Sequence, residues 1–280
     1  MQFTVTHDMD TLQRALVEPA RAGQRLALVP TMGALHEGHM ALIRHAATLA
    51  DAVAVSIFVN PKQFGPNEDL DKYPRMLEAD IEKARAVGAS LVYAPPVGDL
   101  YPDDFSTTVS AGPLSAILEG KFRPGHFDGV ATVVAKLLLR MLPCVAVFGE
   151  KDYQQLCVIR RIVDDLDIPV DIVGMPTVRE PDGLAMSSRN AYLTPQERTI
   201  APKLHEMLTL AAQEIGTGAV AAPVLAQAIA RLEGLGYKVE YLELRETETL
   251  APMESLNVPA RLLVAAWLGK TRLIDNIAVG

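Results

Sequence analysis

Two histidines three residues apart, His36 and His39, stand where an apolar run has ended and a helical pattern begins. Residues 26–29 are typical of a strand, residues 38–50 are typical of a helix, and a glycine-containing turn separates them. Backbone N–H groups at a helix start point outward unpaired, and the helix dipole adds partial positive charge. Neutral imidazoles donate hydrogen bonds to phosphate oxygens, and a protonated ring brings a full charge. The segment therefore predicts an anion site that suits phosphate.

The histidine pair has two other interpretations, a zinc site and a solvated helix start. Zinc needs a third ligand, and the His-Glu-x-x-His spacing of zinc-binding helices is absent. A motif this short also leaves a purely structural role open, so the rest of the chain must distinguish these interpretations.

Two amides, Asn60 and Gln63, follow the apolar run at residues 52–59. Each amide donates and accepts hydrogen bonds, which suits a substrate that carries hydroxyls and a carboxylate. The alternative is an Asn-Pro turn whose amides are solvated.

A lysine follows the apolar run at residues 145–148. Lys151 lies at a predicted strand-to-helix turn, where it can place a point charge on a phosphate. Gln155, one turn into the next helix, can face the same cleft. The alternative is that Asp152 caps that helix and forms a solvated ion pair with Lys151.

Two hydroxyls and a guanidinium, those of Ser187, Ser188 and Arg189, lie in the polar stretch at residues 179–190. Placed in a loop after a glycine turn, they form a good clamp for a polyphosphate. The alternative is a hydrophilic linker between domains.

Strand-like runs alternate with helical patterns through the first two-thirds of the chain. This alternation predicts an α/β fold, a Rossmann-like parallel sheet with helices on both faces. Ligands of such sheets bind beyond the carboxyl ends of the strands, where each polar segment named above begins. The predicted strands are residues 26–29, 52–59, 91–94, 145–148 and 169–174, and the predicted helices are residues 38–50, 71–87, 128–142 and 153–166.

The pattern changes after about residue 178. Helical patterns are followed there by short strands with turn signals, which predicts a smaller C-terminal α+β domain. We therefore predict a Rossmann-like domain at residues 1–177 and a small domain at residues 178–280. The predicted helices of the small domain are residues 194–214 and 223–232, and its predicted strands are residues 239–244, 261–267 and 271–276.

Composition restricts the partners and the compartment. The 280 residues are 49% hydrophobic, which is enough for a large core, and they carry a net charge of −8. Surfaces that bind nucleic acid are normally basic, so small polar or anionic substrates are expected and no nucleic acid. Cys144 and Cys157 lie in apolar runs, as buried thiols of a reducing cytoplasm do. The apolar residues 130–148 are interrupted by charges, and no signal peptide is visible, so we expect a cytoplasmic protein without a membrane span.

Five separated segments together resemble one known family. The His-x-Gly-His segment and residues 186–190 are similar to the two signatures of the nucleotidyltransferase superfamily, which includes class I aminoacyl-tRNA synthetases. All five resemble the pantothenate synthetase (pantoate–β-alanine ligase) family, with a likeness that extends over residues 26–193. The five segments are residues 30–39, 58–65, 122–127, 149–155 and 186–190.

The resemblance implies an activity and an assembly. Members of the family make pantothenate from (R)-pantoate, β-alanine and ATP through a pantoyl-adenylate, with release of AMP and pyrophosphate. The resemblance also implies a homodimer. Because a mixed anhydride is sensitive to water, the small domain is expected to act as a lid over the site.

The resemblance also implies roles for individual residues. The groups expected to act on the phosphates are His36, His39, Lys151, Ser187, Ser188 and Arg189. Gln63 and Gln155 would hold pantoate, helped by Asn60. The residues implied to bind ATP are Met32, Gly33, Ala34, Leu35, His36, Glu37, Gly38, His39, Gly149, Glu150, Lys151, Asp152, Val178, Met186, Ser187, Ser188 and Arg189.

Magnesium is expected to accompany ATP, and here the chain departs from some family members. Those members have adjacent acidic residues near the metal, after a Tyr-Pro-Arg segment. In this chain Ala79 precedes Asp80, so a protein contact to the metal would depend on Asp80 alone.

Two other functions compete with this prediction. One is a nucleotidyltransferase or synthetase-like enzyme that adenylates another acid, and the other is a catalytically silent nucleotide-binding module. Aminoacylation of tRNA is disfavoured by the net charge of −8 and by the lack of an apparent anticodon-reading domain. His36, His39, Lys151 and Arg189 argue against the silent module, which has no need of a complete phosphate clamp.

Overall fold

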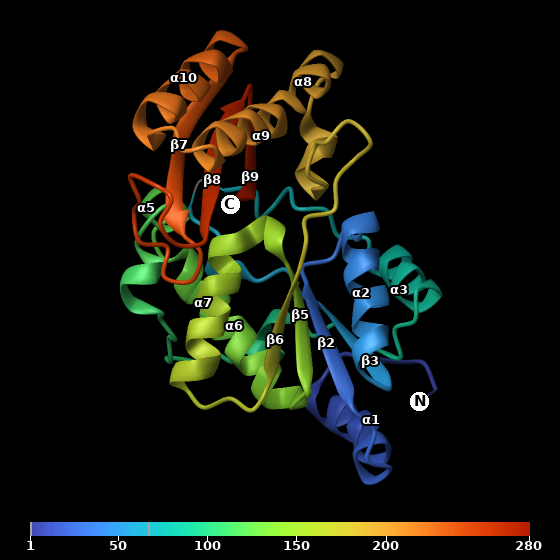
Figure 1. Cartoon of the computed structure of the whole chain (residues 1–280). Coiled ribbons are helices and arrows are strands. Elements are labelled where there is room, and N and C mark those ends of the chain that lie inside the picture. The colour runs from blue at the N-terminus through green and yellow to red at the C-terminus, as the bar shows by residue number, and fades with distance from the viewer. Residues whose placement is uncertain (1, 67) are drawn as a thin grey trace. The chain divides into compact units, whose positions relative to one another are not determined.

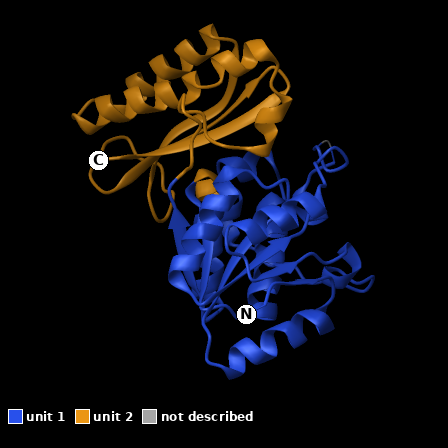
Figure 2. Cartoon of the chain, turned by 90° about the vertical axis from the view of Figure 1, so that its right-hand side faces the viewer, with its two compact units in different colours: residues 1–150, 155–176 blue, residues 151–154, 177–280 orange. Residues whose placement is uncertain are grey.

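The computed structural model describes residues 2–66 and 68–280, which form two compact units (Figures 1 and 2). The first unit contains the described residues up to Glu150 together with Gln155–Pro176. The second contains Lys151–Gln154 and Thr177–Gly280. The short segment with Lys151 therefore groups with the C-terminal part of the chain, although the sequence pattern placed it in the first domain.

A six-stranded parallel sheet forms the centre of the first unit, with the strand order β1-β4-β3-β2-β5-β6 (Figure 1). The predicted parallel α/β fold is confirmed. The strand order reverses between the paired neighbours β2 and β5, and ligands of such sheets bind at this switch point. The strands are β1 (Thr4–Thr6), β2 (Leu26–Thr31), β3 (Ala52–Ile57), β4 (Leu91–Tyr93), β5 (Val145–Gly149) and β6 (Asp171–Met175).

Helices cover both faces of this sheet, which explains the nearly continuous apolar strands. Val29 and Val55 pack in one buried cluster with residues of α2 (Glu37–Leu49) and α3 (Leu77–Ala86). Alternate strand residues point to the opposite face, where α6 and α7 lie and form a cluster of their own (Figure 1). The other helices are α1 (Met9–Arg21), α4 (Val97–Leu100), α5 (Glu119–Phe122), α6 (His126–Met141) and α7 (Tyr153–Asp165). Short 3-10 turns are η1 (Pro61–Gln63), η2 (Gly112–Ser115), η3 (Glu150–Asp152) and η4 (Ser188–Tyr192).

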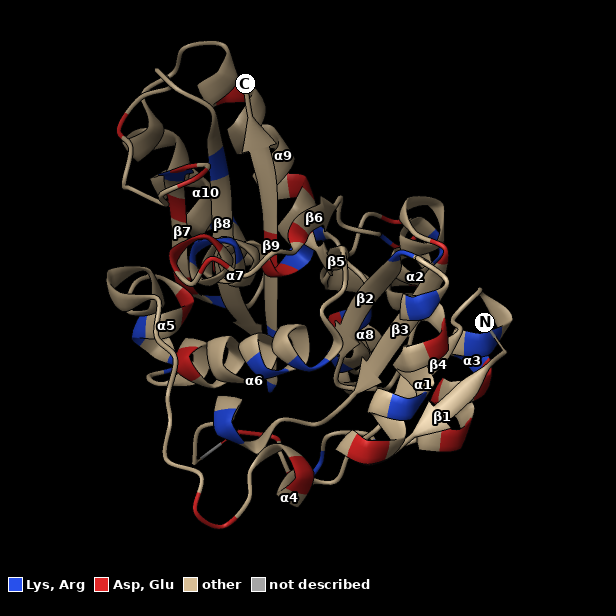
Figure 3. Ribbon diagram, turned by 90° about the horizontal axis from the view of Figure 1, so that it is seen from below, with Lys and Arg blue, Asp and Glu red and all other residues tan. Residues whose placement is uncertain are grey.

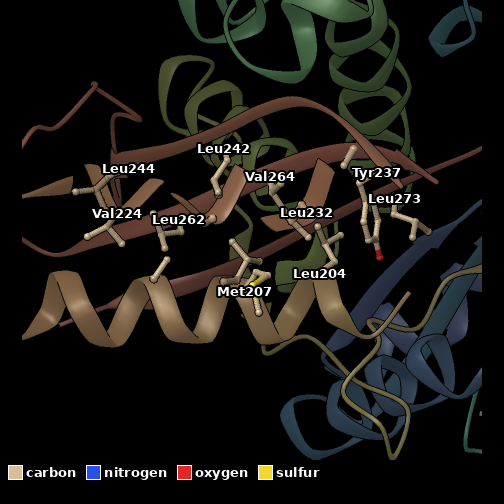
Figure 4. Packing of buried hydrophobic residues seen from close by; sticks show 14 of the residues in the cluster. Leu204, Met207, Val224, Leu232, Tyr237, Leu242, Leu244, Leu262, Val264 and Leu273 are labelled. Atoms are coloured by element: carbon tan, nitrogen blue, oxygen red, sulfur yellow. The ribbon is translucent and has the colours of Figure 1, made fainter. Parts of the chain in front are cut away.

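The second unit is an antiparallel sheet packed against helices, as predicted. Its strand order is β7-β8-β9, and side chains from α9 and α10 interdigitate with apolar strand residues in one core (Figure 4). The elements are α8 (Pro195–Ile200), α9 (Lys203–Gly216), α10 (Ala221–Gly234), β7 (Tyr237–Glu246), β8 (Ala260–Leu268) and β9 (Thr271–Val279).

Prolines account for two differences from the predicted helices. The helix predicted at 71–87 begins only at Leu77, and Pro74 disfavours helical backbone at Tyr73, within the part of the prediction that is not helical. The helix predicted at 194–214 is two helices, because Pro202 has no N–H to bond the preceding turn. The strand Thr4–Thr6 and the helix Met9–Arg21 were not predicted at all.

Charged residues are interspersed in sign along both units (Figure 3). None of the described helices is long and apolar enough to cross a membrane.

Candidate active site

A strained loop connects β2 to α2 at the switch point. Gly33 has φ 82° and Ala34 has φ 51°, a left-handed conformation that costs energy at a residue with a side chain. The buried carboxylate of Asp80 on α3 accepts the N–H groups of Ala34 at 2.7 Å and Leu35 at 2.8 Å. A Cβ added at Gly33 would lie only 3.0 Å from an oxygen of Asp80. Asp80 therefore holds the loop in its unusual conformation.

This arrangement changes the interpretation of Asp80. Both of its oxygens accept hydrogen bonds from backbone amides and the residue is 1% exposed, so its observed role is to position the loop. Among residues 2–66 and 68–280, no three His, Cys, Asp or Glu side chains are grouped so as to hold a metal ion. Contact between Asp80 and magnesium stays an untested prediction.

The two histidines cap α2 with their Nδ1 atoms. The N–H of Gly38 donates to Nδ1 of His36 at 3.1 Å, and the N–H of His36 donates to Nδ1 of His39 at 3.3 Å. The ring centroids are 4.1 Å apart. Because each Nδ1 accepts a hydrogen bond, a neutral ring must carry its proton on Nε2. The rings themselves thus accept two of the backbone N–H groups at the helix start. The Nε2–H group of each ring becomes the donor suited to phosphate.

Asn60 is buried and has all its hydrogen-bonding capacity in use. Its Nδ2 donates to Oε1 of Gln63 and to the carbonyl of Gly129, both at 3.0 Å. Its Oδ1 accepts from the hydroxyl of Tyr101 at 2.9 Å and from the N–H of Lys62 at 3.3 Å. Burial raises the pKa of Tyr101, which keeps that hydroxyl a donor. Asn60 therefore orients Gln63, and the expected help with pantoate is indirect in this structure.

The backbone of Gln63 is held from another direction by α6. His126 donates from Nδ1 to the carbonyl of Gln63 at 2.8 Å, because a carbonyl can only accept. Its Nε2 lies 3.2 Å from Nη1 of Arg123, and Arg123 forms an ion pair with Glu68 at 2.6 Å. Residues 122–127 carried part of the family resemblance without an assigned role. The ring of His126 and the guanidinium of Arg123 position η1. This role is visible only from contacts between residues that are far apart in the sequence.

Acidification is expected to destabilise this part of the protein through His126. Burial and then the charge of Arg123 lower the pKa of His126 from 6.5 to about 4. Between these two values the unfolded chain binds a proton that the folded chain does not, so stability is full above pH 6.5 and is lost as the pH falls toward 4. The loss is up to about 3 kcal/mol at 1.36 kcal/mol per pKa unit.

Urea unfolding at a series of pH values measures this effect. His126→Asn should reduce the dependence on pH above 4.5 and leave the part due to His205, whose pKa burial also lowers. His45→Asn on α2 is the matched control. Arg123 holds the pKa of Glu68 below its usual 4.5, although burial opposes it. Protonation of Glu68 therefore lowers the stability only below pH 4.5. If the His126→Asn variant keeps the full slope, another group is responsible.

Lys151 and its neighbours are held by β9 and by the turn after β7 in the second unit. The carbonyl of Lys151 accepts from Nδ2 of Asn276 on β9 at 2.9 Å. The hydroxyl of Tyr153 donates to the carbonyl of Thr247 at 3.1 Å. The ammonium of Lys151 lies 3.9 Å from the carboxylate of Asp152, a weak ion pair. Gln155 lies on α7 in the first unit and is half-buried.

The serine-rich loop of the second unit is anchored at its base. The N–H of Met186 donates to the carbonyl of Val178 at 3.0 Å, and Ser187 caps η4 by accepting the N–H of Arg189 at 3.3 Å. Arg198 forms ion pairs with Glu180 at 2.5 Å and with Asp182 at 2.6 Å. These contacts give the segment a defined conformation at its base.

The residues expected at the site thus fall into two groups, each organised within its own unit. The first unit brings together the loop 32–39 and Gln63, whose Nε2 lies 3.1 Å from Sδ of Met32. The second unit brings Lys151 and residues 178–189 onto one scaffold. Tyr101, His126 and Asn276 had no predicted role, because each acts on a residue far from it in the chain.

A parallel sheet with a His-x-Gly-His segment at its switch point defines a nucleotide-binding enzyme of the nucleotidyltransferase superfamily. A sequence profile of the family described as Pantoate-beta-alanine ligase matches residues 4–278. The chain therefore belongs to the pantoate–β-alanine ligase family, whose members are AMP-forming ligases.

Individual relatives agree over nearly the whole length. The pantothenate synthetase of Paramagnetospirillum magneticum is 57% identical over 92% of this chain and 91% of its own. A pantothenate synthetase structure from Thermus thermophilus has a TM-score of 0.93, 45% identity and 99% coverage of both chains. The pantoate–β-alanine ligase of Francisella tularensis, solved with Beta-gamma ATP and β-alanine, has a TM-score of 0.84, 36% identity, and 99% and 97% coverage.

Proposed function

We propose that the chain condenses (R)-pantoate with β-alanine to pantothenate at the expense of ATP, through a pantoyl-adenylate. The observation that carries this proposal is the histidine pair at the switch point. Its hydrogen bonds select the tautomer that presents Nε2–H, a donor suited to a phosphate oxygen. The family membership and the named complex of the Francisella relative support the choice of substrates.

The first step joins two anions, so positive charge and fixed dipoles must do most of the work. A carboxylate oxygen of pantoate attacks the α-phosphorus of ATP, and the bond to the oxygen of the β-phosphate breaks to release pyrophosphate. His36 and His39 would donate to the phosphates. Lys151, Ser187, Ser188 and Arg189 would stabilise the developing charge. This step needs no nucleophile from the protein.

The second step forms the amide. The lone pair of the β-alanine amine attacks the acyl carbon, the bond from that carbon to the phosphate oxygen breaks, and AMP leaves. A free amine is mostly protonated at neutral pH, so a proton must be released before or during the attack. Closure of the second unit as a lid would protect the mixed anhydride from water.

Magnesium fits this chain as a companion of the nucleotide. The carboxylate of Asp80 is committed to two backbone amides, and the described residues contain no cluster of metal ligands. Magnesium commonly keeps several waters and binds substrate phosphates with few protein contacts. We therefore assign the metal to the phosphates of ATP and derive no step from it. We also propose a homodimer in the cytoplasm, which sedimentation and cell fractionation would test.

Loss of either glutamine amide should weaken pantoate binding more than ATP binding. An unpaired substrate hydroxyl or carboxylate costs roughly 1–3 kcal/mol, so Gln63→Ala or Gln155→Ala should weaken pantoate binding by about tenfold or more. Calorimetry with each ligand measures the effect, and Gln13→Ala on the exposed face of α1 is the control. Unchanged pantoate affinity with weakened ATP affinity would reverse the assignment.

ATP–pyrophosphate exchange tests the proposed function against its alternatives. Exchange should require pantoate when a panel of carboxylic acids is supplied one at a time. Exchange with another acid would indicate an enzyme that adenylates that acid. A chain that binds ATP but exchanges with none would be a silent nucleotide-binding module.

A further inference from the structure

Two adjacent residues of β9, Asp275 and Asn276, each hold a segment to which we have assigned phosphate binding. Both are buried, with exposed fractions of 4% and 3%. Neighbouring side chains of a strand point to opposite faces, so one strand can hold a segment on each face of its sheet. The roles proposed above give neither residue a contact with a substrate. The reason for burying two polar side chains here therefore has to be found elsewhere.

Asn276 connects β9 to Lys151. Its Nδ2 donates to the carbonyl of Lys151 at 2.9 Å, and its Oδ1 accepts from Nη1 of Arg261 at 2.5 Å. The guanidinium carbon of Arg261 lies 3.9 Å from the ring centroid of Tyr153. Arg261 and Asn276 therefore fix two positions of the segment Lys151–Gln154, and this explains why the segment groups with the second unit.

Asp275 connects β9 to the base of the serine-rich loop. Its two oxygens lie 2.7 and 2.9 Å from the two terminal nitrogens of Arg179, a bidentate ion pair. Arg179 also donates to the carbonyl of Gly183 at 3.1 Å, and it pairs with Ala185 in a short antiparallel bridge. Met186 follows this bridge, and Ser187, Ser188 and Arg189 come next in the chain.

We propose that Asp275 and Asn276 are positioning residues that hold Lys151 and the loop 187–189 on one rigid scaffold, from which both segments bind the phosphates. This proposal rests on the proposed function, because it assumes that both segments contact the triphosphate. A donor misplaced by 1 Å can cost about 10²-fold in rate, so a shared rigid scaffold has a direct use in the first step. The second step breaks the bond to AMP after pyrophosphate has left, and it should depend much less on this scaffold.

Asn276→Asp tests the connection to Lys151. The variant keeps an oxygen for Arg261 and removes the N–H donor to the Lys151 carbonyl. Leaving that carbonyl unsatisfied should lower kcat for ATP–pyrophosphate exchange by about tenfold. Reaction of chemically prepared pantoyl-adenylate with β-alanine should keep its wild-type rate. In a Lys151→Met background, Asn276→Asp should have little further effect, because the group it positions is gone.

Glu240→Gln is the matched control for simple destabilisation. Glu240 on β7 forms a partly buried ion pair with Arg272 at 2.7 Å and accepts from Nε1 of Trp267 at 2.6 Å. This variant should lower the thermal midpoint without changing the ratio of the two half-reaction rates. Asp275→Asn, measured at a temperature where circular dichroism shows it folded, should change that ratio as Asn276→Asp does.

Three outcomes would overturn the proposal. If Asn276→Asp slows both half-reactions equally, or neither, its role is structural or absent. If its effect is undiminished without Lys151, the connection to that residue is not the cause. If Lys151→Met and Arg189→Ala leave pyrophosphate exchange intact, the proposed phosphate roles fail and this inference fails with them. If Lys151→Met and Arg189→Ala lose exchange but Asn276→Asp has no effect, the phosphate roles stand and only the positioning role is wrong.

Discussion

Replacing His36 by Asn is expected to abolish most adenylate formation while leaving α2 intact. Asparagine is among the best N-cap residues, so the helix start should keep its cap, and what is lost is the Nε2–H donor together with the ring contact to His39. Removing one donor to a charged transition state typically lowers the rate by about 10²–10³-fold. Pyrophosphate exchange at saturating ATP and pantoate measures this loss. His39→Ala should have an effect of similar size.

The control for this experiment lies on the same helix. His45→Asn changes the same residue type two turns further along α2, outside the cap. It should exchange pyrophosphate at nearly the wild-type rate. If His36→Asn also kept its activity, the ring would serve the helix alone, and the phosphate role would be wrong.

Replacing Lys151 by Met should slow the first half-reaction by a comparable factor. The thioether chain keeps much of the length and apolar character of the lysine stem and removes only the charge. The hydrogen bond from Asn276 uses the backbone carbonyl of Lys151, so the segment should stay in place. The loss of one preorganised cation at a developing charge predicts about 10²–10³-fold lower exchange.

Lys270→Met serves as the comparison for lost charge. Lys270 is exposed in the turn between β8 and β9 of the same unit, so the net charge changes equally while no proposed phosphate contact is touched. Exchange should be unaffected in this variant. Equal activity of Lys151→Met and Lys270→Met would remove Lys151 from the phosphate site.

Local patterns in the sequence determined most of the helices and strands and the segments that carry the candidate site residues. The strand before the histidines is an apolar run, and the helix after them follows a glycine turn, so neighbouring residues alone define that transition. The parallel fold followed from the alternation of such units. Prolines also act locally: no helix includes Pro74, and Pro202 lies between α8 and α9.

The tertiary structure alone decided which polar groups position others. Asn60 has the local pattern of an exposed turn, yet Tyr101 and Gly129, which lie 41 and 69 residues away, occupy its amide. Asp80, expected near a metal, binds amides of the histidine loop. Lys151 is joined to a strand residue 125 positions later and so groups with the second unit. Hydrogen bonds form between atoms that folding brings within about 3 Å, and neither periodicity nor spacing encodes such distant pairs.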